Sequence, residues 1–324
     1  MSMHGMTGGM RCWARALRPM AFVAALVVLV LAAPVARAVE VALLLSENSG
    51  PEQQFADAFR AALKPGAHRV VHAGAVREGM KVDALSSAGL VLTTGALAAE
   101  IALRDTDRPV LMVLVGIREV QRLQAAYPAR SVGAVVLDQP PERHMRLIRA
   151  ILPEEARIGV LMGPESRFQE QEILRAAEGT GFVVELANVA DPKELVGALQ
   201  AVLDKAGALL PLPDGLVSSP GAARTILLTS YRYRRPIFAF SSAYVSAGAL
   251  AAVFSSAEHI ASDIADLLGS ESVRAGDVAP LLSVLRFPER FDVAVNRTVA
   301  RALGIVVPEE DVLRERVAGG EGTR

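Results

Sequence analysis

The chain has 324 residues, of which 52% are hydrophobic and 21% charged, and its formal net charge is −1. This length suits one large domain or two smaller ones. A charge so close to zero, with no basic tract, argues against a nucleic-acid partner.

The first 38 residues have the pattern of a secretory signal peptide. Arg11, Arg15 and Arg18 precede the apolar run Met20–Ala33, and an Ala-Arg-Ala sequence ending at Ala38 has small residues where a signal peptidase reads them. The run is shorter than the roughly 20 residues that span a membrane, and an uncleaved anchor is the alternative. We expect cleavage near Ala38, a periplasmic location and no stable membrane insertion afterwards.

Cleavage would remove the only cysteine, Cys12. Cys12 precedes the apolar run, whereas a lipid-bearing cysteine directly follows one. Four arginines and no acidic residue would leave with the leader, which takes the net charge from −1 to about −5. The remaining chain could form no disulfide bond, so its stability must come from a hydrophobic core.

Short apolar runs then alternate with longer amphipathic stretches. The runs are apolar throughout, which is typical of parallel strands covered by helices on both faces. Helical stretches of about 10–15 residues between them give the βαβ rhythm of an α/β fold. The predicted strands are Val39–Leu45, Arg69–His72, Leu90–Thr93, Val110–Val115, Ser131–Leu137, Arg157–Met162, Phe182–Leu186, Ala208–Leu210 and Pro236–Phe240.

Two predicted helices have clear boundaries. One begins at the Pro-Pro-Glu sequence of residues 140–142, carries apolar residues on one side and ends before Pro153. The other begins at Asp191, which can cap the helix while Pro192 occupies its first turn and Glu194 completes a capping box.

The βα repeats fall into two halves. Five repeats run to about Leu137 and about four more run to Phe240, with a proline-rich break at Asp138–Pro141 between them. Two Rossmann-like lobes with parallel sheets, joined by crossovers, place a cleft at the carboxyl ends of their strands, where open α/β sheets bind ligands. The polar segment 319–324 is expected to be a disordered tail.

No catalytic constellation is visible: the sequence has neither a phosphate-binding loop nor a nucleophile elbow. His68 and His72 could clamp a metal on a helix, but a strand would hold them about 13 Å apart. His144 and His259 lie among charged helical positions and are predicted to be surface residues. We therefore expect no enzymatic activity, no metal and no cofactor.

Polar loops that directly follow predicted strands are the candidate ligand contacts. Backbone N–H groups and serine hydroxyls at a helix start can hold a carboxylate, and an aspartate can neutralise an ammonium group; plain helix capping is the alternative for each loop alone. Together the loops would line the rim of one cleft. The candidate ligand-binding residues are Ser46, Glu47, Asn48, Thr93, Thr94, Gly163, Glu165, Asp214, Ser241, Ser242 and Tyr244.

Three segments carry a family resemblance: residues 151–162 (ILPEEARIGVLM), residues 236–240 (PIFAF) with Gly248–Leu250, and residues 293–308 (VAVNRTVARALGIVVP). In this order they resemble the ABC-transporter substrate-binding family typified by tryptophan/tyrosine-binding lipoproteins. Asp214 falls where that family has a Pro-Ser-Asp turn. The resemblance extends from about Val39 to the end of the chain.

The resemblance implies a type I periplasmic-binding fold with three crossovers, near Asp138, Ser242–Ser246 and Leu282–Phe287. The first lobe would comprise residues 39–138 and about 245–283, and the second 139–244 and about 284–318. The implied function is to clamp a small, amino-acid-like molecule and deliver it to an ABC permease or another membrane receptor. Loop N–H groups and serines would hold the anionic end of this molecule, and Asp214 would hold its cationic group. We expect a monomer.

The sequence departs from the family pattern in three places. Val115–Glu119 stands where an Asp-Pro loop usually touches the ligand, the lipid-bearing cysteine is missing, and Ala257–Leu268 lacks a mid-helix glycine. These departures leave an alternative open, in which the fold serves as an interaction or sensory module for an outer-membrane receptor or a sensor kinase. A periplasmic hydrolase is disfavoured because no nucleophile–base pair is visible.

Overall fold

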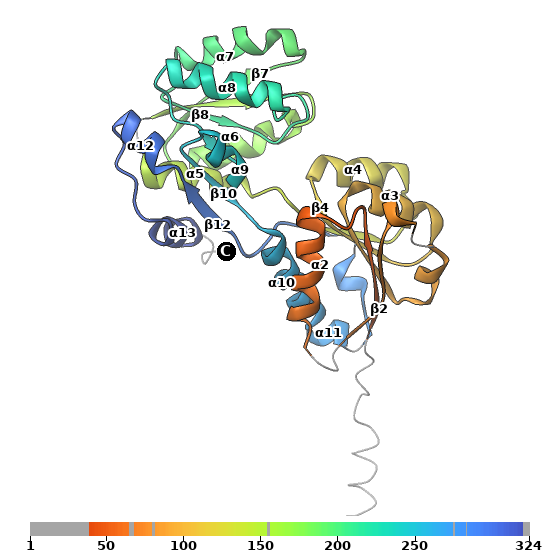
Figure 1. Ribbon diagram of the computed structural model, residues 1–324. Helices are drawn as coiled ribbons and strands as arrows, with labels where there is room; N and C mark the ends of the chain where they lie inside the picture. Colours follow the sequence, from red (N-terminus) through yellow and green to blue (C-terminus); the bar gives the residue numbers. More distant parts are fainter. Residues whose placement is uncertain are drawn as a thin grey trace, which may run out of the picture.

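The computed structural model describes residues 39–64, 68–79, 82–153, 156–274, 276–282 and 284–319. The predicted signal peptide lies outside these residues, as does all but the first residue of the predicted tail. The described chain forms two α/β lobes (Figure 1). The α/β, two-lobed prediction is therefore confirmed.

The first lobe is built on a six-stranded parallel sheet with the order β11-β5-β4-β3-β1-β2. Its strands are β1 (Glu40–Leu45), β2 (Arg69–Ala75), β3 (Leu90–Thr94), β4 (Val110–Val115), β5 (Val132–Val136) and β11 (Leu285–Arg286). Its helices are α2 (Gly50–Ala62), α3 (Gly95–Asp105), α4 (Ile117–Ala126), α10 (Ala257–Leu268) and α11 (Glu271–Arg274), with short 3₁₀ turns η1 (Val76–Glu78), η2 (Val82–Ser87) and η5 (Ala279–Leu281).

Alternate residues of β1 face opposite sides of this sheet, and both sides are covered. Val41 and Leu43 pack with α2 and α10, whereas Ala42 and Leu44 pack with α3. α10 lies beside α2 although some 200 residues separate them in the sequence (Figure 1). Burial on both faces explains why these strands are apolar at every position.

The second lobe has two three-stranded sheets, β7-β6-β8 and β12-β10-β9, which a bridge between Leu209 and Ile237 joins side by side. Only β12 runs antiparallel to its neighbour. The strands are β6 (Arg157–Met162), β7 (Val183–Asn188), β8 (Ala208–Pro211), β9 (Phe238–Ala239), β10 (Ala251–Phe254) and β12 (Asp292–Val295). The helices are α5 (Pro141–Ile151), α6 (Glu170–Glu178), α7 (Leu195–Leu203), α8 (Pro220–Arg232), α9 (Ser242–Ala247), α12 (Arg297–Leu303) and α13 (Glu310–Ala318), with 3₁₀ turns η3 (Arg167–Gln169) and η4 (Pro192–Glu194).

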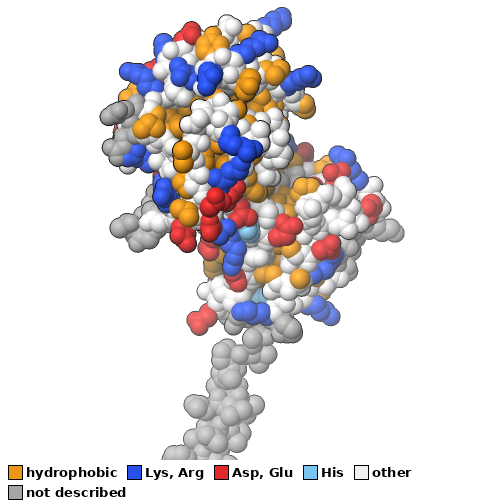
Figure 2. Space-filling view, turned by 60° about the vertical axis from the view of Figure 1, so that its left-hand side comes forward, with side chains coloured by type: hydrophobic (Ala, Val, Ile, Leu, Met, Phe, Trp, Pro, Cys, Tyr) orange, Lys and Arg blue, Asp and Glu red, His pale blue; other side chains and the backbone are white. Residues whose placement is uncertain are grey.

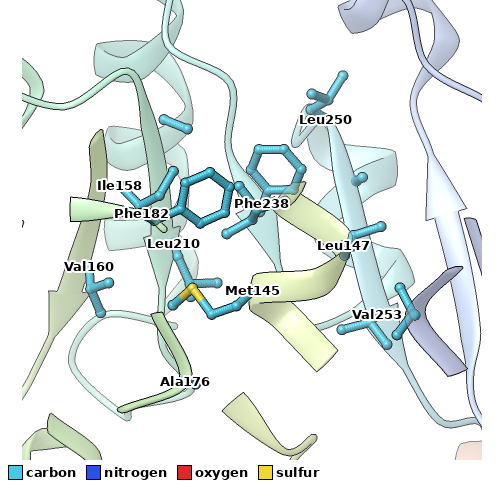
Figure 3. Packing of buried hydrophobic residues seen from close by; sticks show 14 of the residues in the cluster. Met145, Leu147, Ile158, Val160, Ala176, Phe182, Leu210, Phe238, Leu250 and Val253 are labelled. Atoms are coloured by element: carbon cyan, nitrogen blue, oxygen red, sulfur yellow. The ribbon is translucent and has the colours of Figure 1, made fainter. Parts of the chain in front are cut away.

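The core on one side of the second sheet is formed largely by α5 and α6. Figure 3 shows Met145 and Leu147 of α5 near Phe238, with Phe182 and Leu210 on the neighbouring strands and loop. Burying a side chain of this size contributes about 1.5–3 kcal/mol. The capping box predicted at Asp191 is present, with Asp191 accepting from the Lys193 backbone N–H and Glu194 reaching back to the cap.

The lobe boundaries differ from the prediction. Ala251–Phe254 pairs with β9 and β12 of the second lobe, so the chain returns to the first lobe at Ser255–Ser256, not at Ser242–Ser246. Leu285–Arg286 pairs with β5, so the last crossover follows Phe287, and residues 284–287 belong to the first lobe. These strands end later in the chain than the predicted boundaries at about 245 and 284, because β10 and β11 were not among the predicted strands.

Side chains tie the three crossovers together. The Gln139 amide donates to Ser255 Oγ at 2.9 Å, and Ser255 Oγ donates to the carbonyl of Arg290 at 2.6 Å. The Arg143 guanidinium donates to Gln139 Oε1 at 2.9 Å and to the Pro288 carbonyl at 2.7 Å. Figure 2 shows charged side chains of both signs gathered at the waist between the lobes.

Two histidines, His68 and His144, are buried. His68 accepts from the Val39 N–H and meets the Leu268 carbonyl at 2.7 Å, which links β1 to the end of α10. His144 was predicted to lie on the surface, and this was wrong: it is buried because α5 contacts α6, α13 and β10. His144 stands four residues before Ile148, so the helical period could have placed it on the apolar face.

Burial lowers the pKa of His144 to about 4, with the neighbouring Arg143 charge as a smaller cause. The unfolded imidazole, near pKa 6.5, binds more protons between about pH 4 and 6.5. The free energy of unfolding should therefore rise with pH through that window, and His144 alone should cost about 2 kcal/mol on going from pH 7 to pH 5. Urea unfolding of the wild type and His144→Leu at both pH values measures this; equal pH dependence in the two proteins would contradict it.

Among the described helices, none is long and apolar enough to cross a membrane. Within the same residues, no group of three His, Cys, Asp or Glu side chains is placed to hold a metal ion.

Candidate binding cleft

A cleft of about 930 Å³ lies between the lobes, within the size range of small-molecule sites. In the first lobe its walls follow the carboxyl ends of β1, β4 and β5 and the first turns of α2, α4 and α10. In the second lobe they follow the carboxyl ends of β6, β8, β9 and β10. This is the edge at which open parallel sheets bind ligands.

The structure brings five of the eleven predicted residues to this wall: Glu47, Glu165, Asp214, Ser241 and Ser242. The other six do not line it. They are Ser46, Asn48, Thr93, Thr94, Gly163 and Tyr244. Asn48 is exposed outside the cleft, and the remaining five are buried within their own lobes.

Ser46 joins strands and a helix of the first lobe. Its hydroxyl donates to the Thr94 carbonyl at 2.8 Å and accepts from the Ala98 N–H at 3.0 Å. The Thr94 hydroxyl in turn donates to Glu52 Oε2 at 3.0 Å. These contacts hold the turns after β1 and β3 in place. Ser46 and Thr94 therefore support the cleft wall without lining it.

Glu52 occupies the position predicted to cradle a ligand carboxylate. Its Oε2 atom accepts from the Glu47 N–H at 2.9 Å, at the start of α2. The loop between β1 and α2 therefore presents a carboxylate to the cleft in place of a free N–H group. Glu47 itself forms an exposed ion pair with Arg77 at 3.2 Å.

Asp214 organises two loops of the second lobe. It is only 5% exposed, and its Oδ2 atom accepts from the N–H groups of Glu165 at 2.8 Å and Ser166 at 2.9 Å and from the Ser166 hydroxyl at 3.0 Å. Its Oδ1 atom accepts from the Leu216 N–H at 2.9 Å. Glu165 answers by accepting from the Gly215 N–H at 3.0 Å. The loops after β6 and β8 thus hold each other through paired carboxylates.

Gly163 faces the Asp214 carboxylate so closely that a Cβ atom there would overlap it. We expect Gly163→Ala to lower the free energy of unfolding by about 2 kcal/mol, because the carboxylate must move away from its buried donors. Chemical denaturation measures this loss.

The matched control is Gly197→Ala in α7, where a Cβ atom would meet nothing within 4 Å. Alanine is the better helix former, so this variant should gain about 0.5–1 kcal/mol. Equal stability of the two variants would show that Gly163 is not held against Asp214.

Asp138 accepts a hydrogen bond at the start of α4, as Asp214 does in the loop after β6. Its Oδ2 atom accepts from the Ile117 N–H at 2.8 Å, in the first turn of that helix. Burial raises the pKa of Asp138, partly offset by this hydrogen bond. Arg118 follows at the cleft wall, in the segment where the sequence lacks the Asp-Pro loop.

Three aromatic rings complete the wall: Phe168, Phe240 and Phe254. The Phe168 ring is 41% exposed, which leaves it accessible from the cleft. Phe240 meets Tyr244 edge-on with ring centroids 5.5 Å apart. Burial raises the pKa of Tyr244, whose hydroxyl has no hydrogen-bond partner among the described residues.

Sequence reasoning missed Gln54, Arg118, Asp138 and the three phenylalanines. A usable signal existed for two of these residues: Asp138 directly follows the predicted strand Ser131–Leu137, and Phe240 directly follows β9, both at the ligand-binding edge. Phe168 lies in the 3₁₀ turn η3 and Arg118 in the first turn of α4, beyond the residues that directly follow a strand.

A sequence model described as "ABC transporter substrate binding protein" matches residues 86–316. The chain belongs to that family. Its members generally bind solutes without transforming them, and they are typically periplasmic or otherwise extracytoplasmic. The resemblance found in the sequence is thus confirmed. A search of curated proteins found no match.

This protein shares its type I periplasmic-binding fold with solved structures. One is an "ABC domain in complex with L-Trp" from Streptococcus pneumonia, at 20% identity and TM-score 0.57, covering 85% of this chain and 98% of that one. Another is a ligand-free, open substrate-binding protein with adhesive properties from Clostridium difficile, at 18% identity and TM-score 0.64, covering 84% and 96%. At these identities the likeness shows the fold alone.

Proposed function

We propose that this protein is a monomeric periplasmic solute-binding protein that closes its lobes on a small molecule and delivers it to an ABC permease. The observation that carries the proposal is the cleft at the carboxyl ends of both sheets, walled by both lobes. A ligand that contacts both walls stabilises a closed arrangement over an open one. No bond is made or broken in this process.

The crossovers supply the hinge for such a closure. Gln139, Ser255 and the Arg290 carbonyl form one hydrogen-bonded chain across them, and Arg143 adds the Pro288 carbonyl. A change in the angle between the lobes would alter the outer surface near these segments, which is the surface that a permease can distinguish. A similar structure holds L-Trp, which supports an amino-acid-like solute as the first class to try.

Isothermal titration of residues 39–324 against pools of amino acids and amines tests binding, and small-angle scattering with and without the solute tests closure. Leu137→Trp, at a wall position, should obstruct binding, whereas Leu228→Trp on the exposed side of α8 should leave it unchanged. If no solute binds and the shape never changes, the proposal fails.

The sensory alternative predicts the same closure with a different partner. Genes for a permease and an ATPase beside this one would support transport. A neighbouring receptor or sensor kinase gene would support signalling instead.

A further inference from the structure

Acidic side chains outnumber basic ones on the wall of the cleft. It carries seven acidic residues and two basic ones, Arg118 and Arg122. Both lobes contribute acids, so closure brings charges of the same sign together. The acidic residues are Glu47, Glu52, Glu119, Asp138, Glu165, Asp214 and Glu258.

The chain's own carboxylates also occupy several of the backbone N–H groups that could hold an anionic ligand. Glu52 accepts from the Glu47 N–H, and Asp138 accepts from the Ile117 N–H. In the second lobe, Asp214 accepts from two N–H groups and Glu165 accepts from a third. At each of these turns a carboxylate of the chain therefore already takes at least one N–H group, and its charge repels a second anion there.

Basic side chains offset only part of these charges, through the Arg122–Glu119 and Arg77–Glu47 ion pairs. Arg122 is committed to Glu100 at 2.8 Å and to Glu119 at 2.7 Å. Across the described residues, no salt bridge reaches Glu52, Glu165 or Asp214. An uncompensated negative charge therefore remains in a space that closure would remove from water.

Aromatic rings stand in the same space. The exposed Phe168 ring and the Phe240 and Phe254 rings line the cleft together with the carboxylates. The face of a phenyl ring attracts organic cations and offers apolar contact to their carbon atoms. Small inorganic cations would use the carboxylates but leave these rings without a role.

We propose that the ligand is a small organic cation, bearing an amine, guanidinium or quaternary ammonium group and a net positive charge. This inference rests on the proposed function and specifies its solute class. The cation lies between Glu165 on one lobe, whose loop also carries the buried Asp214 charge beside it, and the acids of the other lobe. It therefore relieves the repulsion that closure would otherwise meet. Because the Arg118 guanidinium also lines the cleft, the ligand can carry one carboxylate in addition to its cationic group.

Matched pairs of probes separate charge from shape. L-arginine and L-citrulline differ mainly in side-chain charge, as do choline and 3,3-dimethyl-1-butanol. In titrations of residues 39–324 at low salt, we expect the charged member of at least one pair to bind about tenfold or more tightly than its neutral partner. Added salt should weaken this binding.

Glu165→Gln tests the wall itself. Glutamine keeps an oxygen that can accept from the Gly215 N–H but removes the charge. Affinity for the bound cation should fall about three- to tenfold. Glu178→Gln, an exposed position at the end of α6 outside the cleft, makes the same charge change and should leave affinity unaltered.

The outcomes separate this inference from the function on which it rests. If a neutral or anionic solute binds and closes the lobes while neither cation binds at millimolar concentration, the inference is overturned and the function stands. If no solute of any charge binds, both fall. Equal losses in Glu165→Gln and Glu178→Gln would overturn the assignment to the cleft wall.

Discussion

Replacing Asp214 by alanine is expected to lower the free energy of unfolding by about 4 kcal/mol, a large effect for one side chain. The carboxylate accepts four hydrogen bonds from Glu165, Ser166 and Leu216 in a nearly closed environment. Alanine would leave these donors buried without acceptors. Urea denaturation measures the loss, and the displaced loops should also weaken solute binding.

Asp214→Asn is a milder substitution at the same position. An amide keeps one acceptor oxygen, so we expect a loss of about 2 kcal/mol. Asp204→Ala, an exposed position in the same lobe, should change stability by less than about 0.5 kcal/mol. If Asp214→Ala were as mild as this control, the carboxylate would not be organising the two loops.

Replacing Arg143 by methionine is expected to cost about 3 kcal/mol and to loosen the hinge. The buried guanidinium donates to the Pro288 carbonyl and to Gln139, and it lies 4.4 Å from the centre of the Phe291 ring. Methionine retains much of the apolar stem but none of the donors. Denaturation measures the stability loss, and small-angle scattering of the ligand-free protein should show a broader range of lobe separations.

Arg224→Met on the exposed side of α8 provides the matched control, and neither measurement should change in it. A destabilised Arg143→Met protein with an unaltered scattering profile would mean that the guanidinium supports only the core of the second lobe. The prediction that Arg143 restrains the crossovers would then be wrong.

Much of the fold could be predicted from local patterns. Val110–Val115 and Arg157–Met162 were predicted with the observed bounds, because a continuous apolar run between helical stretches is what a doubly covered parallel strand requires. Strands β10 and β12 were missed because they pair with each other across about 40 residues of chain, a contact that local patterns do not record. Missing β10 displaced the second crossover.

The candidate site was predictable only in outline. The strand-end rule led to Glu47, Glu165 and Asp214, which do line the cleft. The same rule selected Ser46 and Thr94, which point into the lobe and bond to each other's turns. Whether a polar side chain at a strand end faces solvent or the neighbouring turn depends on close approaches that sequence spacing does not record.

The sequence by itself determined the α/β class, the two series of βα repeats, the capping box at Asp191 and the family resemblance, since all of these depend on residues close together in the chain. Tertiary structure decided the lobe boundaries, the burial of His144 and the charge of the cleft. Glu52, Asp138 and Asp214 each cap backbone groups that the fold brings to them. That pairing depends on distances between separate segments, and the cation specificity that we propose rests on it.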